Sequence, residues 1–184
     1  MNRLRIEGLI CLAGFAACVP LANWMIAHVG TVCVPNGPCL VPVAPGIAAP
    51  SGVVMVGLAL VLRDLVQRRL GLAFSAGAIV FGALLSAAVA PARLVVASAA
   101  AFLISEFADL FVYTPLQRRR LVTAVALSGA AGLVVDSLVF LYLAFGGFDF
   151  LAGQIVGKAW MILLSLPAIA WLRQRDERLG IRPA

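Results

Sequence analysis

The chain has 184 residues, of which 63% are hydrophobic and only 12% are charged, and its formal net charge is +6. Soluble domains contain roughly 45–50% apolar and about 25% charged residues, so this composition excludes a soluble protein. It predicts an integral membrane protein with a single transmembrane domain over residues 1–184. The excess positive charge is explained by arginines near the ends of membrane spans, and we expect no nucleic-acid partner, no cofactor and no metal.

Six apolar segments are long enough to cross a bilayer, which takes about 20 helical residues. We expect membrane spans at residues 8–28, 51–70, 72–90, 93–113, 121–145 and 150–172. The second span carries Arg63, Asp64, Arg68 and Arg69 in its last turns, and Gly71 is expected to cap its end. The predicted fold class is an all-α bundle of six transmembrane helices.

The basic residues orient this bundle. If both termini are cytoplasmic, all of the 14 Lys and Arg residues lie on the inner side except Arg93, outside, and Lys158, within a span. Membrane proteins concentrate Lys and Arg in cytoplasmic loops. We therefore expect a multi-pass membrane protein with both termini in the cytoplasm, surrounded by membrane lipid. Gly8–Ala22 also has the character of a signal-peptide core, but the apolar run continues and five further spans follow.

Residues 31–50 separate the first two spans and hold half of the ten prolines. Proline interrupts helices, so we expect an irregular outer loop that either covers the entrance to the bundle or only connects two helices. Cys33 and Cys39 lie in this loop, on the oxidising side, and the sequence leaves open whether they form a disulfide. Cys11 and Cys18 are expected to be packing residues of the first span.

Four ionisable residues lie well inside the later spans: Glu106, Asp109, Asp136 and Lys158. A charged side chain at the centre of a membrane helix costs roughly 2.5–3.5 kcal/mol, so each must be paired, protonated or turned toward a hydrated cavity. Asp136 and Lys158 lie at similar depth on neighbouring antiparallel helices. We predict that they contact each other, either as a purely structural pair or around a shared ligand.

Polar and aromatic side chains recur on one face of the last three spans at helical spacing. These faces carry Ser98, Phe102, Ser105, Glu106, Asp109 and Tyr113, then Ser128, Gly132 and Asp136, then Gln154, Lys158 and Ser165, and the first span adds Asn23. Carboxylates accept hydrogen bonds, amides donate and accept them, and aromatic rings offer flat surfaces. The set fits a flat, polar heterocycle and predicts a small-molecule transporter.

Within this set, Asp109 is expected to accept hydrogen bonds from the N–H donors of the ligand, and Glu106 is expected to shape the same cavity. The alternative is that Asp109 pairs with Arg63 or Arg68. Asp64 is similarly open: it forms an i,i+4 pair with Arg68, or it has a functional role.

Three stretches carry a resemblance to a known family. "RLVVASAAAFLISEFADLFVY" (93–113), "SGAAGLVVDSLVFLYLAFGG" (128–147) and "KAWMILLSLP" (158–167) resemble the last three helices of the queuosine precursor transporter family, also called the vitamin uptake transporter family. "ANW" (22–24) and "LVLRDLVQRRLG" (60–71) resemble its first two helices. The resemblance implies a bundle similar to the substrate-binding subunits of energy-coupling-factor importers. It also implies uptake of 7-cyano-7-deazaguanine or a related deazaguanine across the bacterial inner (cytoplasmic) membrane.

The positions that match the family are Asn23, Asp64, Arg93, Ser98, Phe102, Asp109, Ser128, Asp136 and Lys158. The chain departs from the family at Gln67 and Arg68, where members often carry an acidic residue, and at Leu70, which precedes Gly71 in place of Tyr or Phe. It also departs at Glu106, where an amide can occur, and in the outer proline-rich loop. These departures bear on the substrate more than on the fold. The residues expected to bind substrate are Asn23, Ser98, Phe102, Glu106, Asp109, Asp136, Gln154 and Lys158.

Two other functions stay open. The chain could be a vitamin-binding subunit that works with an energising ATPase module, since Ala13 and Ala17 give the first span a small-residue spacing for docking a partner. It could also be a membrane enzyme acting on lipid with Mg²⁺ at Glu106 and Asp109, but a second carboxylate pair is missing, and we expect no enzyme. The coupling ion, and whether the chain forms a homo-oligomer, are not determined by the sequence.

Overall fold

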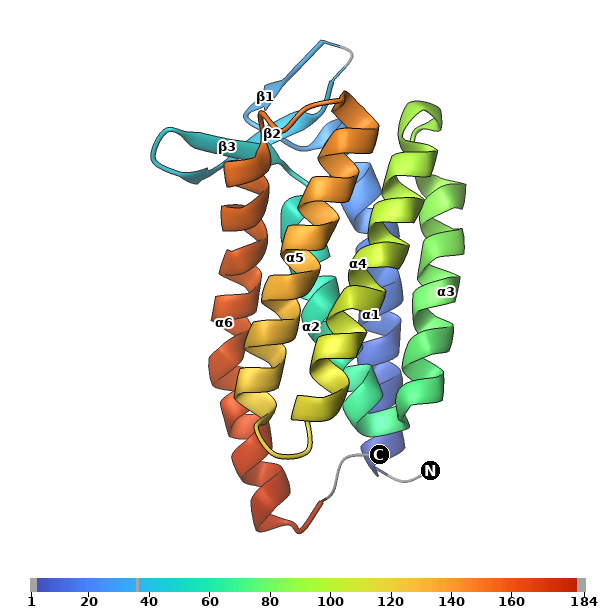
Figure 1. Ribbon diagram of the computed structural model, residues 1–184, viewed down its shortest axis with the longest axis vertical. Helices are drawn as coiled ribbons and strands as arrows, with labels where there is room; N and C mark the ends of the chain where they lie inside the picture. The colour runs from blue at the N-terminus through green and yellow to red at the C-terminus, as the bar shows by residue number, and fades with distance from the viewer. Residues whose placement is uncertain (1–2, 36, 182–184) are drawn as a thin grey trace.

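The computed structural model describes residues 3–35 and 37–181, apart from the side chain of Arg93, so that Arg182 lies outside the described residues. It confirms the predicted bundle of six helices (Figure 1), which are α1 (Arg3–His28), α2 (Val53–Leu70), α3 (Leu72–Val89), α4 (Val95–Leu116), α5 (Leu121–Phe145) and α6 (Leu151–Arg178). Five of these helices are long and apolar enough to cross a membrane, and α2 is the exception.

Helix α2 occupies the centre of the bundle, where it contacts all five other helices (Figure 1). It carries four charged side chains, and all of them are buried: Arg63, Asp64, Arg68 and Arg69. The surrounding helices therefore shield α2 from lipid, which explains why a helix of this composition is compatible with a membrane bundle. Gly71 ends the helix as predicted, with a φ of 92° and its N–H bonded to the Gln67 carbonyl.

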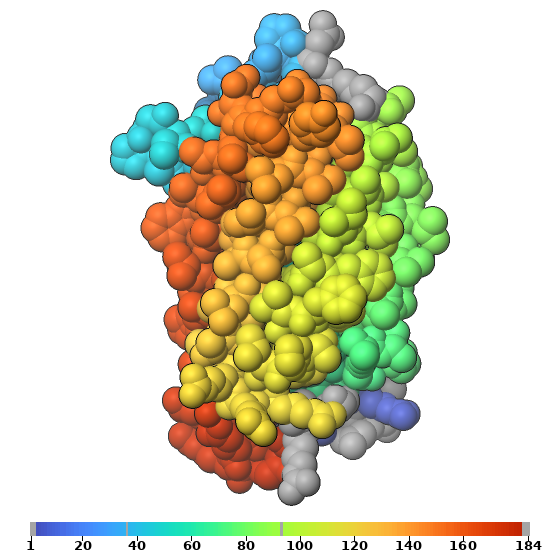
Figure 2. Space-filling model, in the orientation of Figure 1, coloured from blue at the N-terminus to red at the C-terminus, as the bar shows by residue number. Residues whose placement is uncertain are grey.

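The other helices form a wall around α2 in which successive helices are neighbours. Helices α4 and α5 pack along their full lengths and make up much of the face seen in Figure 2. The outward side chains of the wall are large and apolar, and Ile10, Phe81, Phe111 and Leu164 are all more than half exposed. Because an exposed apolar belt of this kind is unfavourable in water, it is the surface that membrane lipid covers.

Helices α1 and α6 extend beyond their predicted ends, 8 and 172, to Arg3 and Arg178. The added turns bring two acidic residues into an ion-pair network at the end of the bundle where α1 begins and α6 ends. In this termini-end network, Asp176 lies 2.7 Å from Arg68 and 2.9 Å from Arg69, while Glu7 lies 2.6 Å from Arg175. Hydropathy marks the apolar thickness of a bilayer and not the end of a helix, so the sequence missed these turns.

The proline-rich segment is not irregular, as the sequence analysis expected, but folds into a three-stranded antiparallel sheet. Its strands are β1 (Val32–Cys33), β2 (Cys39–Ala44) and β3 (Ile47–Pro50), in the order β1-β2-β3. Pro42 belongs to the central strand, yet the pairing of β2 with β3 is irregular between Pro42 and Ala44. Such an irregularity tolerates a residue without an N–H donor, which is how Pro42 fits into the central strand.

The sheet lies at the end of the bundle opposite the termini-end network (Figure 1) and is tied down at several points. A disulfide joins Cys33 to Cys39 across β1 and β2. The Trp160 indole N–H of α6 donates to the Val43 carbonyl at 3.0 Å, and the Ser51 hydroxyl donates to a carbonyl of α1 at 2.7 Å. The sheet is therefore a part of the folded bundle that covers one end of it.

We predict that the sheet faces the periplasm and the termini-end network the cytoplasm. The test replaces Cys11 and Cys18 by alanine, keeps the disulfide, and adds one cysteine at the exposed positions 45 or 119. A membrane-impermeant maleimide should label Pro45→Cys in intact cells and Arg119→Cys only after permeabilisation. Labelling of position 119 but not of position 45 in intact cells would reverse the orientation.

Candidate functional site

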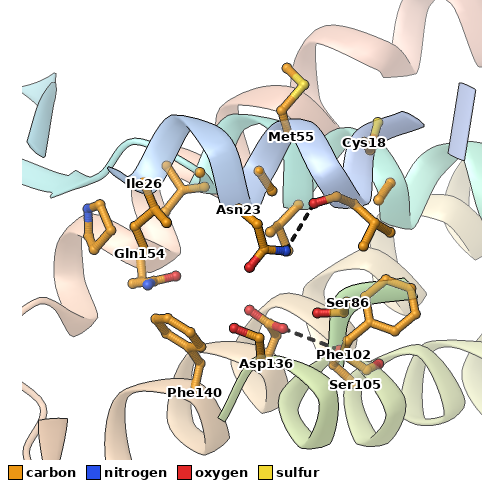
Figure 3. A pocket seen from close by; sticks show the side chains of 18 of the residues that line it. Cys18, Asn23, Ile26, Met55, Ser86, Phe102, Ser105, Asp136, Phe140 and Gln154 are labelled. Atoms are coloured by element: carbon orange, nitrogen blue, oxygen red, sulfur yellow. Dashed lines mark hydrogen bonds between the residues drawn. The ribbon is translucent and has the colours of Figure 1, made fainter. Parts of the chain in front are cut away.

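A cavity lies in the half of the bundle next to the sheet, and side chains from all six helices and from β3 line it (Figure 3). Its volume is about 80 Å³. Since one water molecule needs roughly 10–15 Å³, the cavity holds several waters or one small organic molecule. Its polar lining consists of Asn23, Ser86, Ser98, Ser105, Glu106, Asp136 and Gln154, and its apolar lining includes Cys18, Ile26, Met55, Phe102 and Phe140.

Helix α4 supplies the largest polar part of the wall. Ser98, Phe102, Ser105 and Glu106 are spaced at i, i+4, i+7 and i+8, so that they fall on one face of the helix. All four line the cavity. The polar stripe that the sequence predicted on this helix is therefore confirmed over its first half.

Asp136 is held in the cavity wall by residues behind it. The Lys158 ammonium donates to its Oδ2 at 2.5 Å and to the hydroxyl of Ser137 at 2.9 Å. The second carboxylate oxygen, Oδ1, accepts a hydrogen bond from the hydroxyl of Ser105 at 3.5 Å, and Figure 3 shows the side chains of Asp136 and Asn23 on opposite sides of the cavity. The predicted contact between Asp136 and Lys158 is confirmed, and Lys158 itself lies behind the wall.

Several polar groups in the cavity wall have no hydrogen-bond partner among the described residues. The side chains of Gln154, Ser86 and Ser98 make none, although Gln154 and Ser86 are each only 3% exposed. Asn23 uses its amide N–H to donate to the Val19 carbonyl at 3.0 Å, which leaves its oxygen free. Buried polar groups are normally hydrogen-bonded, so these groups indicate a site that a polar molecule or water completes.

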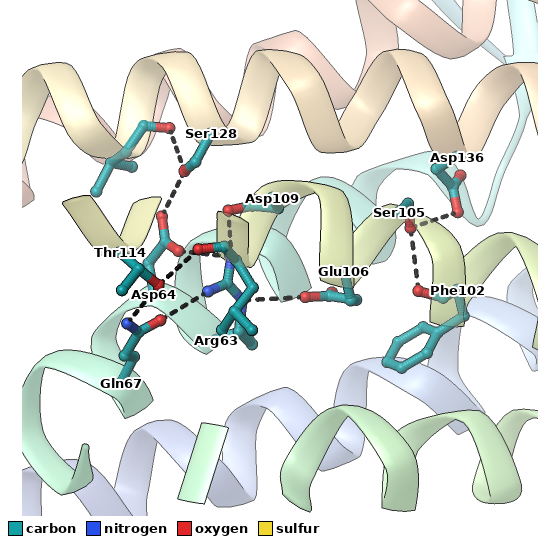
Figure 4. Close-up of polar contacts among 12 residues, drawn as sticks. Arg63, Asp64, Gln67, Phe102, Ser105, Glu106, Asp109, Thr114, Ser128 and Asp136 are labelled. Atoms are coloured by element: carbon teal, nitrogen blue, oxygen red, sulfur yellow. Dashed lines mark hydrogen bonds and ion pairs between the residues drawn. The ribbon is translucent and has the colours of Figure 1, made fainter. Parts of the chain in front are cut away.

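A second polar group lies next to the cavity, toward the termini-end network (Figure 4). The guanidinium of Arg63 contacts three carboxylates: Asp64 at 2.8 Å, Glu106 at 3.2 Å, and Asp109. Its Nη1 also donates to Gln67 at 3.2 Å. These four charged residues, Arg63, Asp64, Glu106 and Asp109, form the Arg63 cluster, and every one of them is at most 2% exposed.

The Arg63 cluster changes two interpretations of the sequence. Asp109 does not line the cavity and is bound by Arg63, which is the alternative arrangement that the sequence left open. The expected pair of Asp64 with Arg68 is wrong, because Asp64 contacts Arg63 and accepts a hydrogen bond from Ser128 at 3.0 Å. Arg68 binds Asp176 instead, since the longer α6 brings that carboxylate within reach.

Most of the residues predicted to bind substrate come together in the cavity wall: Asn23, Ser98, Phe102, Glu106, Asp136 and Gln154. The family-matching residues Asp64, Asp109 and Ser128 lie instead in or beside the Arg63 cluster. Sequence reasoning missed Phe140 and Ser86. Phe140 follows Asp136 by one helical turn, and the same spacing rule would have found it, whereas Ser86 is isolated on an apolar helix and carried no signal.

The buried pair of Asp136 and Lys158 allows a direct test of coupling. Asp136→Asn or Lys158→Met leaves an unpaired buried group, and breaking such a pair costs about 3–5 kcal/mol. We expect the double variant to lose clearly less stability than the sum of the two single variants. Thermal unfolding of purified protein in one detergent measures all three, and additive losses would show that the two residues are not energetically coupled.

Residues 53–172 match the family described as "Putative vitamin uptake transporter". No curated protein and no solved structure matches the chain. The family match spans the larger part of the chain, from the first residue of α2 into α6, and includes the whole Arg63 cluster and the paired Asp136 and Lys158. The chain therefore belongs to the vitamin uptake transporter family.

Proposed function

We propose that this transporter takes up a queuosine precursor, 7-cyano-7-deazaguanine or a related deazaguanine, across the bacterial inner membrane, with both termini in the cytoplasm. The observation that carries the proposal is the position of Asp136, a carboxylate neutralised by Lys158. It faces a cavity in which the Gln154 amide and two hydroxyls have no partner among the described residues. The resemblance of the last three helices to transporters of these precursors supports the same substrate.

The polar groups of the cavity complement the hydrogen-bonding edge of a deazaguanine. That edge presents adjacent N–H donors beside a carbonyl acceptor. A carboxylate accepts two neighbouring N–H donors at once, which is the role proposed for Asp136. The Gln154 amide donates and accepts, and Phe102 and Phe140 offer aromatic surface for the flat ring.

Charge compensation favours a neutral ligand over a cationic one. Lys158 already balances the carboxylate of Asp136 at 2.5 Å, so a ligand gains hydrogen bonds there and not a new ion pair. A ligand that leaves a buried donor or acceptor unmet loses about 1–3 kcal/mol for each such group. The cavity would therefore select its ligand by the pattern of donors and acceptors.

The two ends of the bundle support a path that begins outside. The cavity lies next to the sheet, whereas the Arg63 cluster and the termini-end network lie between it and the other end. In the proposed orientation, the ligand site belongs to the periplasmic half and the cytoplasmic half is closed by ion pairs. Uptake then requires these pairs to separate in an alternating-access movement.

We predict that purified protein binds 7-cyano-7-deazaguanine and that Asp136→Asn weakens binding at least tenfold, a loss of about 1.4 kcal/mol or more. Asp149→Asn, the same change at an exposed loop position, is the matched control and should leave affinity unchanged. Isothermal titration, normalised to the folded fraction, measures both.

Because Asp136→Asn also strands Lys158, Gln154→Leu serves as a second variant. It removes an amide without a protein partner, so it should reduce affinity while leaving thermal stability intact. Titration of guanine, other queuosine precursors and a panel of vitamins defines the substrate. Tight binding of a vitamin together with no detectable binding of any deazaguanine would refute the proposed substrate.

The alternative is a vitamin-binding subunit of an energy-coupling-factor importer, and one observation favours it. Ala13 and Ala17 are both exposed, four residues apart on the outer face of α1, and small residues let another helix approach closely. If an ATPase module docks there, Ala13→Leu with Ala17→Leu should abolish uptake in cells, unlike Ala88→Leu on α3. Uptake by the purified chain alone in liposomes without ATP would argue against this alternative.

A further inference from the structure

The Arg63 cluster contains more buried negative charge than its one guanidinium can balance. Three carboxyl groups surround a single cation, so the fully ionised cluster would carry a net charge of −2 (+1 from Arg63, −3 from Asp64, Glu106 and Asp109). All four side chains are at most 2% exposed. An uncompensated charge is very unfavourable in such a place, and a buried acid becomes neutral instead.

The elements packed around the cluster do not supply the missing positive charge. Arg68 of α2 is bound to Asp176, Lys158 of α6 is bound to Asp136, and α3 has no charged residue. The remaining polar and titratable neighbours are neutral or acidic: Cys18 of α1, Gln67 of α2, Tyr113 and Thr114 of α4, and Ser128 and Asp136 of α5. Among the described residues, no cation is therefore left to neutralise the cluster.

A second observation locates the imbalance at particular atoms. Asp64 Oδ1 and Asp109 Oδ1 both contact the same nitrogen, Nη2 of Arg63. Asp64 Oδ1 and Asp109 Oδ2 are nevertheless fully buried and make no hydrogen bond, and the hydroxyl of Tyr113, whose ring lies against Arg63 at 5.6 Å, also has no partner. A proton on one of these carboxyl groups would provide the hydrogen-bond donor that the bare oxygens lack.

The geometry fits a proton better than a metal ion. The centre of the cluster is already occupied by the guanidinium, which repels another cation. Among the described residues, no group of three or more His, Cys, Asp or Glu side chains is arranged to hold a metal ion. The cluster therefore has the acids of a cation site without the open centre that Na⁺ or Mg²⁺ would require.

Glu106 connects the cluster to the ligand cavity. Its Oε2 accepts a hydrogen bond from Arg63 at 3.2 Å, and the same side chain lines the cavity, which Asp64 and Asp109 do not reach. We propose that the Arg63 cluster is a proton-binding site, and that Glu106 takes up a proton when a neutral ligand fills the cavity. The coupling to the ligand rests on the proposed function, whereas the proton-binding site does not.

The direction of coupling follows from solvation. A ligand in the cavity displaces water from Glu106 and makes its negative charge more costly. The protonated carboxyl group, in contrast, offers an O–H donor to a ligand carbonyl. Ligand and proton therefore bind together, and the transporter moves both in the same direction.

The first test needs no ligand. Infrared spectra of the full chain in lipid nanodiscs at neutral pH should show the carbonyl stretch of a protonated carboxyl group, shifted in D₂O and lost on alkaline titration. Absence of this band in the wild-type protein, or its replacement by changes that depend on Na⁺ and not on pH, would overturn the proton-binding site.

The second test adds 7-cyano-7-deazaguanine. The band should grow on ligand binding in the wild type and in the matched control Glu177→Gln, an exposed position on α6, but not in Glu106→Gln. If this ligand does not bind while the ligand-free band persists, the proposed substrate fails and the proton-binding site stands. If the ligand binds and the band does not grow, the coupling through Glu106 is refuted.

The transport consequence is measured in liposomes that contain the purified chain and a trapped pH-sensitive dye. One proton carried per ligand gives about tenfold accumulation per unit of imposed pH difference, because one pH unit corresponds to about 1.4 kcal/mol. Wild type and Glu177→Gln should reach this accumulation and acidify the lumen. Accumulation by Glu106→Gln that follows the pH difference in the same way would contradict the role of Glu106.

Discussion

The structure depends on one electrostatic constraint: the charged second half of α2 must be neutralised inside an apolar bundle. Arg63 and Asp64 are fully buried there, and an isolated ionised group in such surroundings is unfavourable by many kcal/mol. Arg63 forms ion pairs with Glu106 and Asp109 of α4. Asp64 accepts a hydrogen bond from Ser128 of α5. Arg68 and Arg69 form ion pairs with Asp176 of α6. Because each partner comes from a different helix, these contacts determine which helices surround α2 and at what height they meet it.

The cavity follows from the same arrangement. The contact of Glu106 with Arg63 sets the rotation of α4 about its axis. The residues on the same face of the helix then also point into the bundle: Phe102 and Ser105 on the side of the sheet, and Asp109 in the cluster (Figure 4). At the level of the cavity, Asp136 of α5 and Lys158 of α6 neutralise each other in the same way. The ion pairs thus fix the helices and leave three uncharged side chains of the cavity wall, Ser86, Ser98 and Gln154, without a hydrogen-bond partner among the described residues.

Sequence reasoning succeeded where the depth of a residue in the bilayer determines its neighbours, and it failed where the packing of the helices selects among several nearby partners. Hydropathy predicts the helices because the bilayer sets a minimum apolar length, and counting residues from the helix ends predicts the meeting of Asp136 with Lys158. The i,i+4 spacing rule fails for Asp64, which contacts Arg63 and Ser128, while Arg68 binds Asp176 of the longer α6. Proline content also gave a wrong prediction, because the segment expected to be an irregular loop forms a sheet whose pairing is irregular next to Pro42.

Residue type alone does not separate scaffold from site in a membrane transporter, because both use the same carboxylates and amides. Whether a buried polar side chain has a hydrogen-bond partner within the protein does separate the scaffold residues from the site residues. Asp176 and Lys158 bind partners within the protein and hold helices together, whereas Gln154 and Ser86 are buried without a partner among the described residues and gain one only from what enters the cavity. Glu106 is the exception that joins the two classes. One of its oxygens accepts a hydrogen bond from Arg63, and its side chain also lines the cavity. A change in the charge of Glu106 therefore alters the electrostatics of both the Arg63 cluster and the cavity. In the proposed coupling, a residue in that position would transmit the occupancy of the cavity to the ion pairs around Arg63 through its own protonation.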